Sequence, residues 1–385
     1  MLDHTGAMGG AELALIRLLD HLDPAITTHT VLFSEGPFAE RLEESGHSVE
    51  VLPLNPRLAG AGRVEAGATP LTAARNALRV LPYAVRLGLR LRRLAPDLIH
   101  STSLKADLIA IPAALIARRP LVWHIHDRIS PDYLPGPMVR LMRTLARWAP
   151  TRVIVNSAGT AATLPKVPRI AVAYPGYSAD QLGPSPLERR APATPVVGIL
   201  GRVSPTKGQI EFVRAAALVR RDHPDTRFRI IGAPLFGEDT YEQQVRAEVA
   251  ALGLEDAVEF TGFVADPSDE LDQLTVCVHA SGQPEPFGQV IVEAMARGIP
   301  VVATHGGGVT EIVRPAPDSE PLGWLVPPGD PSALADAVAE ALEHPEVAAR
   351  RALAAWLSVQ ERFPISRTAA VVSEVWRSAA RAPRH

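Results

Sequence analysis

The sequence predicts an α/β protein made of two Rossmann-like domains, each a parallel sheet wrapped by helices. With 385 residues, the chain is long enough for two domains with separate cores. Short β-branched runs alternate with helix-like segments along its length, a pattern typical of parallel sheets. Between the two alternating halves lies "YPGYSADQLGPSPLERRAPATP", whose proline, glycine and small polar residues indicate a linker.

The expected strands divide evenly between the halves. In the second half they are "PVVGIL", "RFRIIG", "AVEFTG", "TVCVHA", "IPVVAT" and "GWLVP"; in the first they are "THTVLF", "SVEVLP", "DLIHS", "LVWHIH", "TRVIVN" and "RIAVA". Only a stub of strand, "MLDH", precedes the first glycine loop, so the first strand is short or residues are missing upstream. We expect an N-terminal domain over 1–178, a linker over 179–194, a second domain over 195–361 and a final helix and tail over 362–385.

Composition excludes several classes of protein. Hydrophobic residues at 46% and charged residues at 21% are ordinary for a folded globular chain. Cys277 is the only cysteine, which excludes an intramolecular disulfide and a cysteine-based zinc cluster. We find neither an apolar run of eighteen residues nor the pattern of a signal peptide, so we expect a cytoplasmic protein without a membrane span.

The net charge of -3 conceals an asymmetry between the halves. Residues 1–178 carry a balance of +6 and the remainder a balance of -9; within 57–152 there are 16 lysines and arginines against 5 acids. In that basic part, "PLTAARNALRVLPYAVRLGLRLRRLAPD" spaces its arginines in a helical pattern that Pro82 is expected to interrupt. An anionic membrane surface or a phosphorylated acceptor would suit this segment, as would an ordinary helix with a solvated basic face.

Unusual residues follow the expected strands of the second half, at the sheet edge where α/β proteins bind ligands. In "GRVSPTKG", Arg202 and Lys207 precede a helix, and two cations beside a glycine loop suit a diphosphate. In "SGQPEPFGQVIVEAMARG", Glu285 lies in the loop and Glu293 lies on the next helix, where a carboxylate can bind a vicinal diol such as a ribose. The N-H groups near Phe287, Gly288 and Gln289 could hold phosphate oxygens. A surface loop with solvated charges would have the same sequence, so each motif taken alone fits either a ligand site or a surface loop.

Weaker signals occur elsewhere. The loop "HGGGVTEIV" allows close backbone approach through its glycines, and "GAMGGAEL" places Gly9 and Gly10 at a helix start. "WHIHDR" places His124 and His126 on one strand face, with His126 at the carboxyl end. Each pattern also fits a purely structural role. Because no D-x-D triplet and no histidine pair at the helix spacing of metal ligands occurs in the sequence, we predict no metal requirement and no cofactor.

Together, "GRVSPTKG", "EPFGQVIVEAMARGIPVVATHGGGVTEIV", "GGAEL" and "HDR" resemble the retaining glycosyltransferases of family 4, including the glycogen-synthase-like and mannosyltransferase types. The resemblance covers most of the chain and is strongest over 195–331. It implies the GT-B architecture, in which two Rossmann-like domains face a cleft and a C-terminal helix crosses back to the first domain. It also implies transfer of a sugar from a nucleotide diphosphate to an acceptor, without a metal and with retention by front-face substitution.

The resemblance also implies roles for individual residues. Arg202 and Lys207 correspond to the pair that binds the donor diphosphate, and Glu293 to the acid on the ribose. Glu285, with the amides of Phe287 and Gly288, corresponds to the group near the transferred sugar. His126 is similar to the active-site histidine, and Gly10 to the glycine whose amide approaches phosphate. "YPGYSAD" departs from the usual Asn-Gly-hydrophobic-Asp turn of the family, which leaves the local geometry of the linker open.

Three alternatives remain at the level of the sequence. A hydrolysing nucleotide-sugar epimerase would use a similar cleft without an acceptor, and a catalytically silent protein would bind the donor alone. A dinucleotide-dependent dehydrogenase is disfavoured because neither half has a G-x-G-x-x-G after its first strand. The nucleotide base, the sugar and the acceptor do not follow from the motifs.

Overall fold

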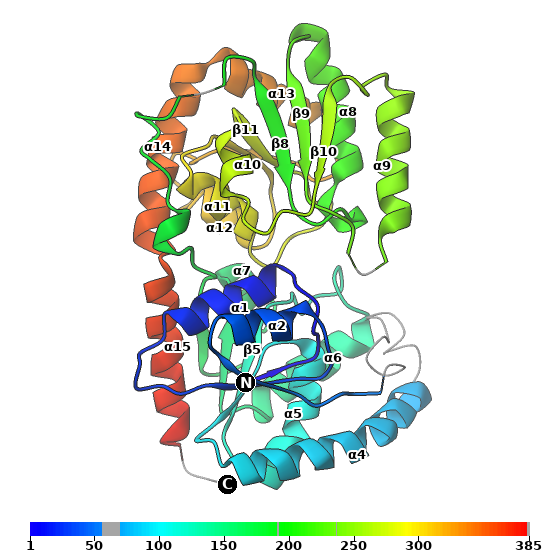
Figure 1. Ribbon diagram of the computed structural model, residues 1–385, viewed down its shortest axis with the longest axis vertical. Coiled ribbons are helices and arrows are strands. Elements are labelled where there is room, and N and C mark those ends of the chain that lie inside the picture. Colours follow the sequence, from blue (N-terminus) through cyan, green and yellow to red (C-terminus); the bar gives the residue numbers. More distant parts are fainter. Residues whose placement is uncertain (56–69, 191, 236, 383–385) are drawn as a thin grey trace. The chain divides into compact units, whose positions relative to one another are not determined.

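The computed structural model describes residues 1–55, 70–190, 192–235 and 237–382 (Figure 1). The chain divides into two units, each with its own parallel sheet. Unit 1 comprises Met1–Gly176 together with Ile365–His385, and unit 2 comprises Tyr177–Pro364. The predicted α/β class is therefore confirmed in both halves. No helix in the described ranges has the length and apolar character needed to cross a membrane.

Unit 1 is built on a seven-stranded sheet of order β3-β2-β1-β4-β5-β6-β7, in which every pairing is parallel. The predicted stub is a real strand of two residues at the centre of this sheet, where Leu2 pairs with both Val31 and Ser101. The strands are β1 (Leu2–Asp3), β2 (His29–Leu32), β3 (Ser48–Val51), β4 (Ile99–Ser101), β5 (Leu121–Ile125), β6 (Arg152–Val155) and β7 (Ile170–Val172).

The two faces of this sheet bury different helices. One core joins Leu121, Trp123 and Ile125 of β5 to the inner sides of α4 (Pro70–Leu94), α5 (Leu104–Ala117) and α6 (Gly136–Trp148). Val122 of the same strand points to the opposite core, which contains α1 (Gly10–Asp20), α2 (Pro37–Glu44) and α15 (Ile365–Ala380). The alternation along β5 is the period of two expected of a strand buried on both faces. The short helix α7 (Ala158–Ala162) follows β6.

The C-terminal helix α15 returns to unit 1, as predicted. It buries Val372, Trp376 and Ala379 against the α1 side of the sheet, and Trp376 Nε1 donates a hydrogen bond to His100 Nδ1 at 2.8 Å. Apolar residues at helical spacing and one specific buried hydrogen bond therefore fix this helix.

Unit 2 contains a six-stranded parallel sheet of order β10-β9-β8-β11-β12-β13. All six strands predicted for this half are present: β8 (Val196–Leu200), β9 (Arg227–Ile231), β10 (Val258–Gly262), β11 (Val276–His279), β12 (Val301–Thr304) and β13 (Trp324–Val326). The helices are α8 (Gln209–Asp222), α9 (Asp239–Ala251), α10 (Ser268–Asp272), α11 (Gln289–Ala296), α12 (Gly308–Val313), α13 (Pro331–Glu343) and α14 (Pro345–Arg362).

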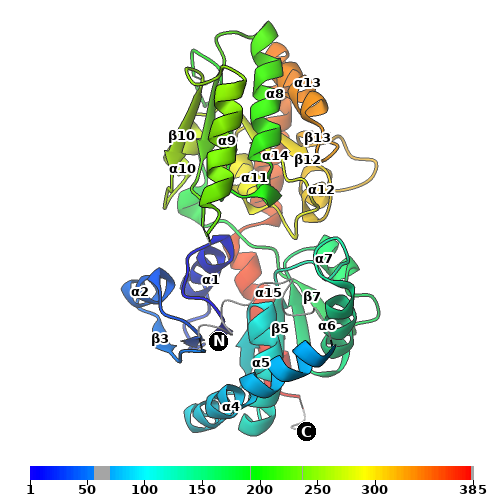
Figure 2. The ribbon, with the colours of Figure 1, turned by 90° about the vertical axis from the view of Figure 1, so that its right-hand side faces the viewer.

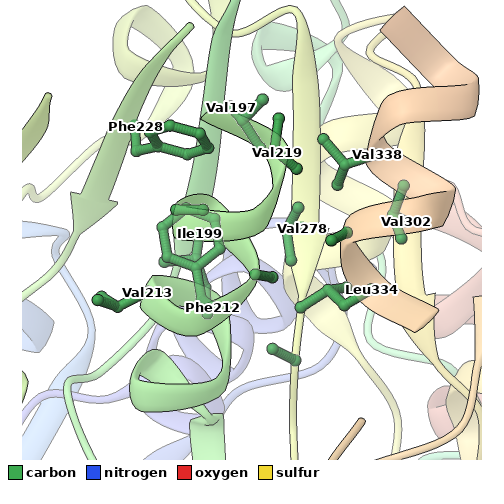
Figure 3. Packing of buried hydrophobic residues seen from close by; sticks show 14 of the residues in the cluster. Val197, Ile199, Phe212, Val213, Val219, Phe228, Val278, Val302, Leu334 and Val338 are labelled. Carbon is green, nitrogen blue, oxygen red and sulfur yellow. The ribbon is translucent and has the colours of Figure 1, made fainter. Parts of the chain in front are cut away.

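The main core of unit 2 lies between the sheet and the helices α8, α9 and α13. Phe212 and Val219 of α8 point toward Phe228 of β9 and Val197 of β8 (Figure 3). Phe212 and Phe228 meet edge to face, with their ring centroids 6.1 Å apart. Because strand order places β8 and β11 side by side at the centre, this core fixes the positions of the loops that leave both strands.

Three details differ from the sequence prediction. Residues 179–194, expected as a linker, belong to unit 2. Gly183 N donates to Ala296 O, and Arg189 donates to the carbonyl oxygens of Asp272 and Leu274 at the end of α10. The crossing back to unit 1 begins at Ile365 rather than at residue 362. The helix α4 runs through Pro82, which was expected to interrupt it. Pro82 is exposed, so solvent can satisfy the carbonyl group that loses its backbone partner.

Candidate active site

The candidate site in unit 2 is formed by loops that leave three neighbouring strands at their carboxyl ends. Strands β8, β11 and β12 lie side by side and parallel. Their loops carry the predicted cations, the predicted glutamate loop and the triple glycine, respectively. Parallel strands place all three loops at one sheet edge, which is where α/β proteins bind ligands.

The loop after β8 is closed by a buried side chain. Gln209 Nε2 donates to Arg202 O at 2.9 Å, and Gln209 Oε1 accepts from Ser204 N at 3.3 Å. Gly208 ends the loop at φ +74°, where an added Cβ would lie 1.9 Å from Ala280 O. Only glycine permits this approach, so Gly208 brings the short 3₁₀ helix Pro205–Lys207 against the end of β11.

The triple glycine of residues 306–308 packs against the loop that carries Glu285. Gly307 adopts φ +61°, and a Cβ there would lie 1.9 Å from Glu285 O. Gly308 N donates to the same carbonyl oxygen at 3.0 Å. The close backbone approach that the sequence predicted for this loop is therefore to the chain's own Glu285 segment, which it holds in place.

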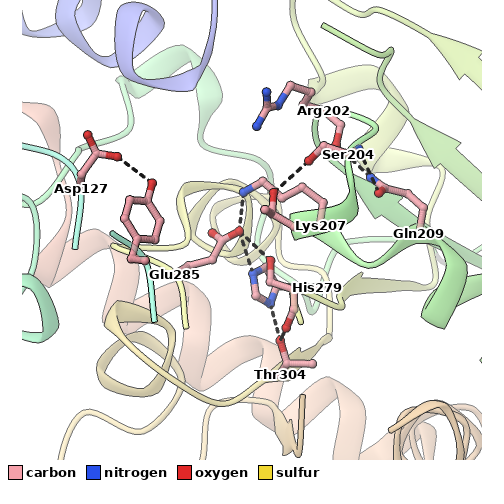
Figure 4. Close-up of polar contacts among 11 residues, drawn as sticks. Asp127, Arg202, Ser204, Lys207, Gln209, His279, Glu285 and Thr304 are labelled. Atoms are coloured by element: carbon pink, nitrogen blue, oxygen red, sulfur yellow. Dashed lines mark hydrogen bonds and ion pairs between the residues drawn. The ribbon is translucent and has the colours of Figure 1, made fainter. Parts of the chain in front are cut away.

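Glu285 is the centre of a polar cluster (Figure 4). Its Oε1 contacts Lys207 Nζ, accepts a hydrogen bond from Ser281 Oγ at 2.6 Å and lies 3.4 Å from His279 Nε2. Glu285 is almost completely buried, and its Oε2 has no hydrogen-bond partner within the described ranges. Figure 4 shows the guanidinium group of Arg202 and the ammonium group of Lys207 pointing to the same side.

The orientation of His279 follows from the hydroxyl group of Thr304. Thr304 Oγ1 donates its single proton to Ser281 O at 2.9 Å, and it lies 3.2 Å from His279 Nδ1. Nδ1 must therefore carry the proton that Thr304 Oγ1 accepts. The other ring nitrogen, Nε2, faces the carboxylate of Glu285.

Opposing effects set the pKa of Glu285. Burial raises it, but the nearby Lys207 and His279 outweigh burial and hold the pKa well below its ordinary value of 4.5. Glu285 is therefore an anion at neutral pH and does not suit the role of general acid.

The low pKa of Glu285 predicts an acid-labile unit 2. A carboxyl group whose folded pKa is depressed stabilises the fold above its unfolded pKa, and this contribution is lost as the pH falls below about 4.5. We expect Glu285→Gln to lower the free energy of unfolding near pH 7 by about 1.5 to 3 kcal/mol. The difference from the wild type should shrink below pH 4.5, in urea titrations followed by circular dichroism. A constant difference across that range would show that the charge of Glu285 contributes nothing.

The other predicted residues of unit 2 lie on the same segment. Gly288 precedes α11 at φ +113°, and Gln289 begins the helix. Gln289 Nε2 donates to Glu293 Oε1 at 2.8 Å, which orients that carboxylate.

Burial and then the charge of Glu293 raise the pKa of Cys277 to about 12, so this thiol is inert at neutral pH.

Phe287 has a structural role that the sequence did not indicate. Its side chain is buried and packs edge to face on Phe363, with ring centroids 5.6 Å apart. The side chain anchors the segment between Glu285 and α11, while the expectation for its amide group remains a prediction.

The remaining predicted residues lie in unit 1. Gly9 is the N-cap of α1 and Gly10 its first residue. His126 follows β5 directly and stacks on His124 with a centroid distance of 4.1 Å. Both histidines and residues of α1 line a cavity of about 20 Å³. Burial, followed by the charge of His126, lowers the pKa of His124 well below 6.5, so His124 is neutral and structural.

Unit 1 also has a buried and a partly buried carboxyl group at the carboxyl edge of its sheet. Asp3, at the end of β1, accepts hydrogen bonds from Thr102 Oγ1 and Thr5 N. Glu12, in the first turn of α1, has its pKa raised to about 7 by burial and then by the charge of Asp3. A group that changes charge near neutral pH at a ligand edge is a candidate for proton transfer.

Comparisons with known proteins assign the family. Residues 37–181 match the model of Glycosyltransferase Family 4, and residues 188–355 match the model of Glycosyl transferases group 1. A D-inositol 3-phosphate glycosyltransferase of Streptomyces scabiei is 30% identical over 312 residues, covering 74% of this chain and 68% of its own. The chain belongs to the group 1 glycosyltransferases.

Solved structures agree with this assignment. The structure of Anabaena Alr3699/HepE in complex with UDP and glucose has 31% sequence identity and a TM-score of 0.80, with 98% of each chain covered. Among the sequence relatives, the lipopolysaccharide core biosynthesis mannosyltransferase LpcC of Rhizobium leguminosarum bv. viciae is 25% identical, over 78% of this chain and 91% of its own. The glycosyltransferase described here thus has the α/β GT-B fold class that its motifs predicted.

Several residues of the candidate site were not predicted from the sequence. His279, Ser281, Thr304 and Gln209 all support Glu285 or the cation loop. One signal for His279 was present, since it ends a strand of otherwise apolar residues at the ligand edge. The sequence did not indicate the buried role of Gln209, because a glutamine in the first turn of a helix is usually solvated.

Proposed function

We propose that this glycosyltransferase moves a sugar from a nucleotide diphosphate sugar to an acceptor bound by its basic N-terminal half, with retention of anomeric configuration. The contact between Lys207 and the buried anion Glu285, at the carboxyl edge of the sheet, carries the proposal. This contact holds the ammonium group of Lys207 at the sheet edge, where it can bind a diphosphate. It leaves Oε2 of Glu285 available to accept a hydrogen bond from a sugar hydroxyl. HepE, which has been solved with UDP-glucose, makes UDP-glucose the first donor to test.

In the proposed reaction, each donor group meets a different part of the site. Arg202 and Lys207 bind the diphosphate, assisted by the amides of Phe287, Gly288 and Gln289 and by Gly9 and Gly10. Glu293 accepts hydrogen bonds from the ribose diol, Glu285 from the transferred sugar, and His126 lies near that sugar.

The proposed bond changes follow front-face substitution. The glycosidic bond to the diphosphate breaks while the acceptor oxygen bonds to the anomeric carbon from the same face. The departing phosphate oxygen takes the acceptor's proton, so no enzymic nucleophile is needed. Negative charge grows on the diphosphate as the bond breaks, and the fixed charges of Arg202 and Lys207 lower the barrier by stabilising it.

The proposal includes no metal and no cofactor, because the two cations supply the charge that a metal would otherwise provide. It also includes a cytoplasmic location, in keeping with the single buried cysteine. The acceptor class, whether glycan, lipid-linked or small-molecule, is left to experiment.

A binding screen followed by product analysis tests the proposed function. Thermal shift with UDP, GDP, ADP and dTDP, each free and as its sugars, should reveal the donor, because a ligand of the native state raises the melting temperature. Transfer should then proceed in EDTA, and NMR should show the donor's anomeric configuration in the product. An inverted linkage would exclude retention, and an epimerised free sugar would exclude the transferase.

Replacing Glu293 and replacing Glu285 should have different effects, the first on donor affinity and the second on kcat. We expect Glu293→Gln to weaken donor binding about tenfold to a hundredfold, because hydrogen bonds from the ribose to a charged acceptor are lost. Glu285→Gln should instead lower kcat about 10²-fold, with little change in donor affinity. Calorimetry and initial rates measure both, with Glu340→Gln on the exposed side of α13 as a control. Equal loss of donor affinity in both variants would contradict these assignments.

A further inference from the structure

The helices α4, α5 and α6 form one layer on the face of the unit 1 sheet opposite α1 and α15. Their inner residues share a single core with β5, and α4 packs across α5 (Figure 2). Their outer residues therefore face away from the same side of the sheet. We call the outer surface of these three helices the layer surface.

The layer surface is unusually apolar. Of the ten large hydrophobic side chains that are well exposed in the described part of the chain, six lie on it. The most exposed are Trp148 of α6 at 76% and Leu115 of α5 at 74%. The other four are Leu81, Val85, Leu89 and Leu141. Such a concentration on one face indicates an interaction surface rather than scattered exposure.

The exposed apolar residues lie in stripes beside arginines. On α4, Leu81, Val85 and Leu89 follow one another at four-residue spacing, next to a row of arginines. On α6, Leu141 and Trp148 are seven residues apart and again have exposed arginines beside them. The arginines of the layer surface are Arg79, Arg86, Arg92, Arg93, Arg118, Arg140 and Arg147. The structure does not describe the side chains of residues 70–78, which include Arg75.

Acidic groups are scarce near these stripes. The only carboxylate within the described side chains of the three helices is Asp107, which is fully buried. Glu50 of β3 pairs with Arg90 at 2.9 Å. α4 borders a hollow of about 450 Å³ that is lined by this Glu50–Arg90 pair, by two further arginines, Arg86 and Arg93, and by apolar residues such as Leu89. The hollow gives an anionic group access to cations next to an apolar stripe.

We propose that the layer surface rests on the surface of an anionic lipid bilayer, with its apolar stripes at the boundary between headgroups and acyl chains. Arginines beside apolar residues on the same helices match the two chemistries of that boundary, and an exposed tryptophan is typical of it. The charge complementarity favours phospholipid phosphates over a protein surface, which would present cations as well as anions. This inference does not depend on the proposed donor chemistry, because none of the residues proposed to bind the donor lies on the layer surface.

Vesicle binding by the full chain tests the proposal. The protein should co-sediment with vesicles of phosphatidylcholine and phosphatidylglycerol but much less with phosphatidylcholine alone. Added salt should weaken the binding, because exposed charges are screened. Absence of binding to the anionic vesicles, or equal binding to both kinds, would overturn the proposal.

Surface variants locate the contact. Arg86→Gln combined with Arg93→Gln should lower the partition coefficient about tenfold or more, because each arginine near an anionic surface contributes to binding. Leu89→Gln should lower it severalfold by removing apolar burial. Arg314→Gln and Leu252→Gln, exposed positions of unit 2, are the matched controls. Controls that lose binding equally would show that the layer surface is not the site.

Tryptophan fluorescence gives an independent readout of orientation. Trp148 is the only one of the five tryptophans that is well exposed. Vesicles with brominated anionic lipids should therefore quench the wild type, while Trp148→Phe should bind with little quenching. If the quenching is unchanged in Trp148→Phe, α6 does not enter the boundary. If the arginine pair affects only affinity for a soluble phosphorylated sugar, the surface binds acceptor rather than lipid.

Discussion

Replacing Lys207 with methionine is expected to lower kcat/KM for sugar transfer about 10²- to 10³-fold, the usual effect of removing one group that stabilises charge in a transition state. The ammonium group of Lys207 contacts a buried carboxylate whose pKa is far below its ordinary value. Its position is therefore fixed before a donor arrives. A fixed charge costs no reorganisation while negative charge grows on the departing diphosphate.

Methionine keeps the length of the lysine side chain but removes its charge. Glu285 would retain Ser281 and His279 as partners, so unit 2 should still fold. Lys207→Arg is the matched control: it restores the charge with a different shape and should recover part of the rate. Initial rates with saturating acceptor measure the effect, and circular dichroism checks the fold. A methionine variant with wild-type kcat/KM would exclude Lys207 from the reaction.

The strands of both units were predictable because their signal is local. Runs such as "VVGIL" and "VCVH" combine β-branched residues with burial on both faces, and the structure has a strand at each. The two-residue strand β1 has no such signal, although it is central in its sheet, because its pairing with β2 and β4 depends on residues far along the chain. The path of α4 through Pro82 likewise depends on solvent exposure, which a sequence does not reveal.

The site shows the same division between local and distant information. Arg202, Lys207 and Glu285 were found because each follows a strand at the ligand edge. The partners that hold them, Gln209 and His279, were not, since a hydrogen bond between loops of different strands leaves no pattern in the sequence. The sequence indicated a close backbone approach at the triple glycine, but it did not indicate that the partner is the backbone of Glu285.

Replacing Gly307 with alanine is expected to affect both stability and turnover, because this glycine meets two constraints at once. Its φ of +61° and ψ of -138° suit glycine alone. In addition, a Cβ would lie 1.9 Å from Glu285 O, so the loop that carries Glu285 must move. We expect the free energy of unfolding to fall by about 3 kcal/mol or more, which exceeds the roughly 1 to 2 kcal/mol that a positive φ alone costs.

A matched glycine separates the two constraints. Gly329 has φ +72° but open space around a Cβ, so Gly329→Ala has the backbone strain without the collision. It should lower stability by about 1 to 2 kcal/mol and leave kcat/KM unchanged. Gly307→Ala should in addition lower kcat/KM about 10²-fold, since a shift of about 1 Å at a reacting group has that effect. If both variants kept full activity at a temperature where they are folded, the position of Glu285 would not matter for transfer.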